Sequence, residues 1–116
     1  MFDYDPPWMS LFLMEEAEPW AARSGVSEVA RGPRGFLTAY KLASGEPACL
    51  TWDPHSGHHW TDVRRRFVNR FVQQAKINRE KWWTKKGHPT RRHLALIMWA
   101  YSPTPRRVAD WLRSVQ

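Results

Sequence analysis

The apolar residues between positions 61 and 78 recur at the spacing of an α-helix, and this pattern constrains the fold more than any other feature of the chain. On a wheel of 100° per residue, six apolar side chains fall in one half: Val63, Phe67, Val68, Phe71, Val72 and Ala75. Polar side chains fill the other half: Arg65, Arg66, Asn69, Arg70, Gln73 and Lys76. The sequence therefore predicts an amphipathic helix from 61 to about Asn78, capped by Thr61 or Asp62.

This helix lies in a strongly basic part of the sequence. The 29 residues from Arg64 to Arg92 hold eleven Lys and Arg and a single acid, Glu80, on a chain whose net charge is +7. Aromatic side chains lie between these cations, which indicates a folded surface rather than a disordered tail. Such a surface is typical of a protein that binds a polyanion, most often a nucleic acid. The first 20 residues, by contrast, hold five acids and no Lys or Arg.

Length and composition fit one globular domain over residues 1–116. We predict an α+β fold that is mostly helical and has three parts. Residues 1–34 form an acidic N-terminal helix and a connector, residues 35–52 form a central β-hairpin, and residues 61–116 form the basic helical part with three C-terminal helices.

The first two parts are predicted from local signals. The N-terminal helix is expected at about Pro7–Ala17, because proline is tolerated in a first turn, and Pro19 is expected to end it. Gly35–Leu42 alternates bulky and smaller side chains, Ser44–Pro47 has the residues of a turn, and Ala48–Trp52 is a second β-rich run. Together these segments predict the hairpin.

The last two helices follow an irregular segment. Lys81–Gly87 has no helical pattern, Pro89 is expected to begin a helix that ends near Tyr101, and Thr104 is expected to cap a final helix that begins at Pro105. The core sides of these two helices are predicted to be Leu94, Ile97, Met98 and Tyr101 in the first, and Val108, Trp111, Leu112 and Val115 in the second.

The basic part supplies the candidate site. Arg66, Asn69, Arg70 and Gln73 share one face of their helix, and these residue types read base edges in a major groove. Tryptophan between lysines, as in the KWWTKK run, can stack on unpaired bases, and we expect one of the two tryptophans to be buried and the other partly exposed. The predicted nucleic-acid-binding residues are Arg64, Arg65, Arg66, Asn69, Arg70, Gln73, Lys76, Arg79, Lys81, Trp82, Lys85, Lys86, Arg91 and Arg92.

Two other functions remain open at this point. A protein-interaction module, such as an inhibitor or adaptor that docks on an acidic surface of a larger complex, would also use Trp and Arg as anchors. A nuclease is the third reading, because the order of His58, His59, Asn78 and His88 resembles that of His-Asn-His nucleases. Asn78 lies at the end of a predicted helix rather than in a loop, so we predict a non-enzymatic protein with no catalytic residue, metal or cofactor.

The remaining features concern compartment and partners. The single Cys49 is expected to be a small buried hydrophobe. No apolar run reaches membrane-spanning length, so no membrane partner is predicted. No basic segment precedes Leu11–Met14, so we expect no secretory signal and a cytoplasmic protein. The sequence predicts nucleic acid (DNA or RNA) or an acidic protein as the partner and leaves the oligomeric state open.

Overall fold

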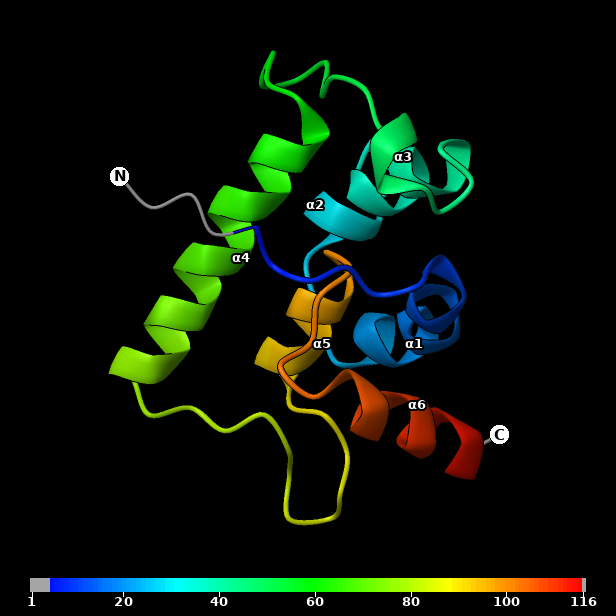
Figure 1. Ribbon diagram of the computed structural model, residues 1–116. Helices are drawn as coiled ribbons and strands as arrows, with labels where there is room; N and C mark the ends of the chain where they lie inside the picture. Colours follow the sequence, from blue (N-terminus) through cyan, green and yellow to red (C-terminus); the bar gives the residue numbers. More distant parts are fainter. Residues whose placement is uncertain (1–4, 116) are drawn as a thin grey trace.

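The computed structural model describes residues 5–115, and within them the chain is helical with no sheet (Figure 1). β-Type pairing is limited there to two isolated bridges, Trp52–His59 and Trp83–Pro89. The elements in chain order are α1 (Leu11–Arg23), α2 (Glu28–Arg31), α3 (Phe36–Leu42), the 3₁₀ turn η1 (Pro47–Cys49), α4 (Trp60–Ile77), α5 (Arg91–Ile97) and α6 (Pro105–Ser114).

The predicted α+β class and its central hairpin are wrong, because residues 36–42 form α3 and residues 47–49 form η1. The side chains of Phe36, Leu37, Tyr40 and Ala43 are buried. Their spacing of one, four and seven residues is that of a helix face rather than of a strand. The segment predicted as a strand is therefore a helix, and one face of this helix packs against the core.

The N-terminal helix begins later and ends later than predicted. The hydroxyl of Ser10 caps α1 by accepting a hydrogen bond from the backbone N–H of Leu13. Pro19 lies inside the helix instead of ending it. Ala17 and Ala21, on either side of this proline, are both fully buried, so packing of the apolar stripe outweighs the backbone hydrogen bond that proline removes.

The three C-terminal helices are found where the sequence predicts them, with two changes at their ends. His59, not Thr61 or Asp62, caps α4 through its Nδ1. The helix predicted to reach Tyr101 ends at Ile97, and Ala100 then takes a left-handed φ of 59°. The segment Lys81–Gly87 is irregular, as predicted.

The core is rich in aromatic rings and surrounds α5. Phe36 contacts Tyr40, Trp60 and Trp99 with ring-centroid distances between 5.3 and 5.9 Å. Cys49 is exposed in η1, so its predicted burial is wrong. Within residues 5–115 no helix is both long and apolar enough to cross a membrane.

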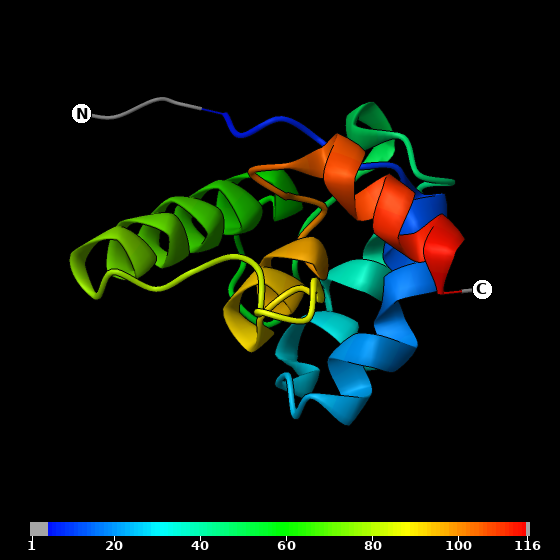
Figure 2. The same cartoon turned by 90° about the horizontal axis from the view of Figure 1, so that it is seen from below.

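Helix α4 lies along one edge of the molecule. Its first turn adjoins the loop that follows α3, and its C-terminal half extends away from the other helices (Figures 1 and 2). Trp60, Val68 and Ala75 are buried against the body of the protein. One side of this helix is therefore part of the core, and the opposite side is free to contact other molecules.

Candidate nucleic-acid interface

The outward side of α4 carries most of the residues predicted to bind. Arg66, Arg70, Gln73 and Lys76 are exposed, whereas Asn69 is half-buried. Arg70 also lies over the ring of Phe67, with its guanidinium carbon 5.6 Å from the ring centroid. Their burial pattern confirms that the helix is amphipathic, and it brings the predicted reading face together on one exposed surface.

Arg65 lies on the flank of α4 and is already engaged. Its Nη2 forms an ion pair with the carboxylate of Asp62, one turn earlier in the helix. The side chain is half-buried, and its Nε is buried without a hydrogen-bond partner. A phosphate that binds here therefore competes with a local carboxylate, which makes Arg65 a weaker candidate than Arg66.

Arg64 belongs to the core, so its predicted role in binding is corrected. Its side chain is 0% exposed, the largest of the fully buried side chains. The guanidinium donates hydrogen bonds to four backbone carbonyl oxygens at 2.7–2.9 Å, those of Pro6, Pro7, Trp99 and Ala100. It also lies 3.8 Å above the ring of Trp8. A buried cation with this many acceptors cannot turn outward to meet a phosphate.

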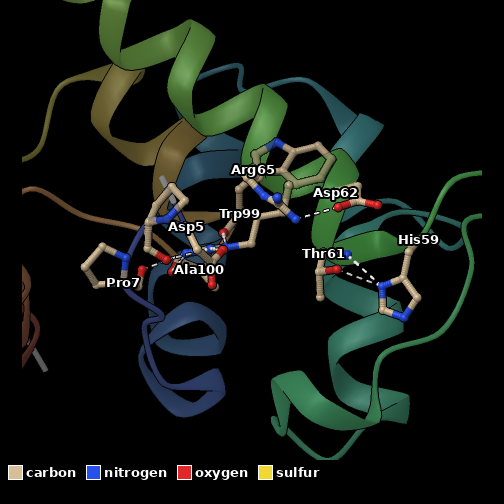
Figure 3. A network of polar contacts seen from close by, with 10 residues as sticks. Asp5, Pro7, His59, Thr61, Asp62, Arg65, Trp99 and Ala100 are labelled. Carbon is tan, nitrogen blue, oxygen red and sulfur yellow. Dashed lines mark hydrogen bonds and ion pairs between the residues drawn. The ribbon is translucent and has the colours of Figure 1, made fainter. Parts of the chain in front are cut away.

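Figure 3 shows that two segments far apart in the sequence lie close together near α4. Asp5 and Pro7 from the N-terminal segment lie beside Trp99 and Ala100 from the turn after α5. The Asp5 carboxylate is 3.9 Å from Arg64 and is itself exposed. Arg64 therefore connects the chain before α1, the turn after α5 and α4, and the position of the outward side of α4 depends on it.

The segment after α4 carries four more exposed cations: Arg79, Lys81, Lys85 and Lys86. Arg79 has a left-handed φ of 56°, which ends α4 and redirects the chain. A hydrogen bond from the N–H of Thr84 to the carbonyl of His88 closes the turn that presents the two lysines. Backbone geometry, rather than a helix, sets the position of these lysines.

Trp82 and Trp83 face the body of the protein, and both are half-buried. This differs from the predicted arrangement of one buried and one partly exposed ring. Trp83 donates from its Nε1 to the hydroxyl of Thr104 at 3.1 Å and has Arg107 over its ring at 4.1 Å. The ring of Trp82 meets that of His93 edge-on. Both rings hold the segment onto α5 and α6, so Trp82 has less free surface for stacking than predicted.

His93 is the centre of this attachment. It is fully buried, and its Nδ1 and Nε2 lie 2.8 and 2.7 Å from Trp82 O and Ser102 Oγ. The carbonyl can only accept, so Nδ1 carries the proton and the Ser102 hydroxyl donates to Nε2. Burial lowers the pKa of His93 to about 4, against the raising effect of the hydrogen bond to Trp82 O and with a smaller lowering effect from the charge of Arg107. The imidazole is therefore neutral at physiological pH.

The other histidines are not gathered into a site. His55 and His58 are exposed in the loop before α4, and His59 is the helix cap. His88 lies against Trp20 and Trp111. Across residues 5–115, no three His, Cys, Asp or Glu side chains are placed to hold a metal ion together.

Arg91 and Arg92 differ in exposure and in ion pairing, as Arg66 and Arg65 of α4 do. Arg91 is exposed, and its guanidinium donates to the carbonyl of Gly25 at 2.9 Å. Arg92 is half-buried, forms a 2.6 Å ion pair with Glu80 and lies over the ring of Phe71. Arg91 is therefore the better placed of the two for an external anion.

Two acids of the N-terminal helix, Glu15 and Glu18, are paired outside the basic stretch. Glu18 forms an ion pair with Arg31 at 3.3 Å, and Glu15 forms one with Lys41 at 3.8 Å. These contacts bind α1 to its neighbours α2 and α3, so Glu15 and Glu18 serve the fold there rather than the outward side of α4.

Seven exposed cations of α4 and of residues 79–86 remain once the inward and ion-paired ones are set aside, and we call them the outward basic surface: Arg66, Arg70, Lys76, Arg79, Lys81, Lys85 and Lys86. None of the seven forms an ion pair with any residue in the range 5–115. No protein-family model matches the chain, and no curated protein is significantly similar to it.

Proposed function

We propose that this protein binds nucleic acid, without catalysis, through the outward basic surface. The observation that carries the proposal is the absence of ion pairs, among the described residues, to the seven exposed cations on α4 and the segment after it. Unpaired cations on a folded surface repel one another, and a polyanion relieves this repulsion. Each contact to a phosphate also releases a counterion from the nucleic acid.

The shape of α4 supports the same function. At 1.5 Å per residue its 18 residues span about 27 Å, so its cations can contact phosphates at several points along a strand. The core side of the helix anchors it, and so the outward side needs no reordering when it binds. Arg66 and Arg70 are one turn apart and form the centre of the surface.

The direct test is a titration of fluorescently labelled DNA and RNA with the purified protein at about 50 and 200 mM salt. With five or more phosphate contacts, we expect affinity to fall by about 10²–10³ between the two conditions. Unlabelled heparin is a useful competitor, because it reports the polyanion component alone. Binding that is absent, or that does not change with salt, would contradict the proposal.

A separate assay addresses catalysis. We expect the protein with Mg²⁺, Mn²⁺ or Zn²⁺ to leave plasmid DNA and RNA uncut. We also expect the double variant His58→Ala, His59→Ala to bind as the unmodified protein does at pH 7.5, because neither histidine belongs to the outward basic surface. Metal-dependent cleavage that this variant abolishes would make the protein a nuclease.

A protein-interaction module is the second candidate, and a different surface favours it. Leu42 and Trp52 are 84% and 64% exposed, on either side of a hollow of about 580 Å³ between α3 and residues 51–55. Tryptophan is enriched among the residues that dominate binding energy in interfaces. If the salt titration fails, an acidic protein that contacts the outward basic surface or this hollow is the alternative to pursue.

A further inference from the structure

A hollow of about 500 Å³ lies between α2, α4 and α5, beside the outward basic surface. Phe67 and Phe71 of α4 form one wall, and Val29 of α2 forms the other. Arg91 and Arg92 lie at its edge. We call it the Phe71 hollow. Its size is within the range of sites that take small organic molecules, and its lining is mainly apolar, as is usual for such sites.

The aromatic wall of the Phe71 hollow is a continuous row of rings. Trp99 stacks on Phe67 at a centroid distance of 4.5 Å, and Phe67 meets Phe71 at 4.1 Å. The guanidinium of Arg92 then lies over Phe71 at 4.8 Å, where Glu80 and Gln74 hold it. These rings, already fixed by packing against the core, offer apolar contacts to a flat group that enters the hollow.

A second hollow, of about 550 Å³, lies between the end of α1, residues 84–90 and α6, and we call it the Trp20 hollow. Trp20 and Trp111 meet edge-on at 5.2 Å, and His88 stacks on Trp20. Lys85 and Lys86 of the outward basic surface line the same hollow. It therefore repeats the combination found in the first hollow, aromatic rings bordered by cations.

Arg91 lines both hollows, so the two are neighbours along one side of the molecule. Its side chain is exposed and is oriented by the hydrogen bond to Gly25 O. Glu80 is the one acidic side chain among the described residues that lines either hollow, and Arg92 neutralises it. A ligand that reaches from one hollow to the other passes over a cation and meets aromatic rings on both sides.

From this arrangement we infer that the nucleic acid is single-stranded, with unpaired bases in the Phe71 and Trp20 hollows and the strand between them held at Arg91. This inference rests on the proposed function and adds the class of nucleic acid. In a duplex the faces of the bases are covered by stacking, so a duplex offers phosphates but nothing for these hollows. A single strand offers both, and aromatic rings tolerate any base sequence because every base has a flat face.

The unmodified protein provides the first test, with three labelled probes of the same length, about 20 nucleotides. They are a single strand of mixed sequence, the matching duplex, and an abasic strand that has the sugar–phosphate chain without bases. We expect the single strand to bind about 10-fold or more tightly than the abasic strand, since one stacked base accounts for such a factor. We also expect it to bind more tightly than the duplex.

Two conservative variants locate the contacts. Phe71→Leu keeps an apolar side chain of similar size but removes the flat ring, and Phe12→Leu is its control, because Phe12 is 67% exposed on α1 and lines neither hollow. Arg91→Gln is paired in the same way with Arg106→Gln, an exposed arginine at the start of α6. We expect Phe71→Leu to lower single-strand affinity about 5- to 10-fold while abasic affinity stays unchanged. Arg91→Gln should weaken both probes.

The outcomes separate the inference from the proposed function. Equal, salt-dependent binding of the single strand, the abasic strand and the duplex would overturn the inference and leave the proposed function standing. Failure of every probe to bind would overturn both. If Phe71→Leu is misfolded by circular dichroism, the ratio of single-strand to abasic affinity in the unmodified protein decides the question, because it requires no variant.

Discussion

The two sides of α4 use arginine for opposite purposes, although Arg64 and Arg66 are only two residues apart. Arg64 is fully buried, and four carbonyl oxygens and the ring of Trp8 surround its guanidinium. Arg66 is exposed on the opposite side and forms no ion pair with the described residues. The comparison teaches that charge alone does not identify a binding residue, because the position on the helix decides which role an arginine has.

The same division continues beyond α4. Trp82, Trp83 and His93 join the irregular segment to α5 and α6 through ring contacts and hydrogen bonds. Lys85 and Lys86 of the same segment are exposed and line the Trp20 hollow. The inward residues of the basic stretch hold the fold, and the outward residues are available to a polyanion. Each prediction below separates these two roles.

The largest effect is expected from the substitution Arg64→Met. Methionine fills part of the space, but it leaves the carbonyls of Pro6 and Trp99 buried without the donor that satisfies them. We expect the free energy of unfolding to fall by about 3–5 kcal/mol, as measured by urea denaturation. The matched variant Arg66→Met should change it by less than about 0.5 kcal/mol. Similar stability of the two variants would show that Arg64 and Arg66 do not differ in their contribution to the fold.

A smaller loss of stability is expected when the pH falls. Well above pH 6.5 the imidazole of His93 is neutral in both the folded and the unfolded chain, so it adds no pH dependence there. Between pH 6.5 and about 4 the unfolded chain takes up a proton at this group and the folded protein does not, because burial lowers the pKa of His93 to about 4. The free energy of unfolding should therefore fall by about 3 kcal/mol over this range, on top of the effect of other groups.

The control for this prediction is His93→Gln, which removes the titrating group. The variant should be less stable than the unmodified protein at pH 7.5, because Trp82 O and Ser102 lose their partner. The stability difference between the two proteins should narrow as the pH falls from 6.5 to 4. Parallel pH profiles from denaturant titrations would show that His93 titrates normally in the folded state.

The next effect concerns the irregular segment. Trp83→Phe removes the hydrogen bond from Nε1 to Thr104 but keeps an aromatic ring, so we expect a stability loss of about 1 kcal/mol and no change in nucleic-acid affinity. The double variant Lys85→Gln, Lys86→Gln should do the reverse and weaken binding without a change in thermal midpoint. If Trp83→Phe weakened binding as strongly as the lysine pair, the inward residues would be contacts too.

The smallest effect is expected from Asn69→Ala combined with Gln73→Ala. These amides alter the preference among sequences only if α4 lies in a groove and reads base edges. With phosphate contacts alone, we expect a change in affinity of less than about threefold, equal on probes of different sequence. A shift in sequence preference, measured by competition between two oligonucleotides, would place α4 in a groove.

How much of this fold the sequence predicts depends on the strength of each local pattern. The apolar residues of 61–78 keep the helical period over the whole segment, and α4 is found where it was predicted. At Gly35–Leu42 the bulky residues fit an alternating pattern as well as a helical one, and the prediction of a strand was wrong. The burial of Tyr40, and of Ala43 three positions later, shows that the helical spacing was the informative one. An eight-residue window is too short to separate the two periods.

The candidate site also has features that the sequence indicates and features that it does not. Arg64 lies four residues before Val68 and eleven before Ala75, which puts it on the apolar side of the helix, and the prediction of a binding role for Arg64 missed this signal. The four carbonyl acceptors of Arg64 had none, because they come from residues 35 or more positions away. The two hollows also have no signal in the sequence, since Trp20, Phe71 and Trp111 are brought near Arg91 only by tertiary packing.

The most direct test of the account is the salt dependence of single-strand binding by Arg66→Gln, Arg70→Gln beside the unmodified protein. Each phosphate contact contributes about 0.7 to the slope of log affinity against log salt for a single strand, so the account predicts a slope shallower by about 1.4 in the double variant. It also predicts an unchanged free energy of unfolding, because both side chains are exposed on the outward side. An unchanged slope, or a loss of stability as large as that of Arg64→Met, would contradict the division between inward and outward cations.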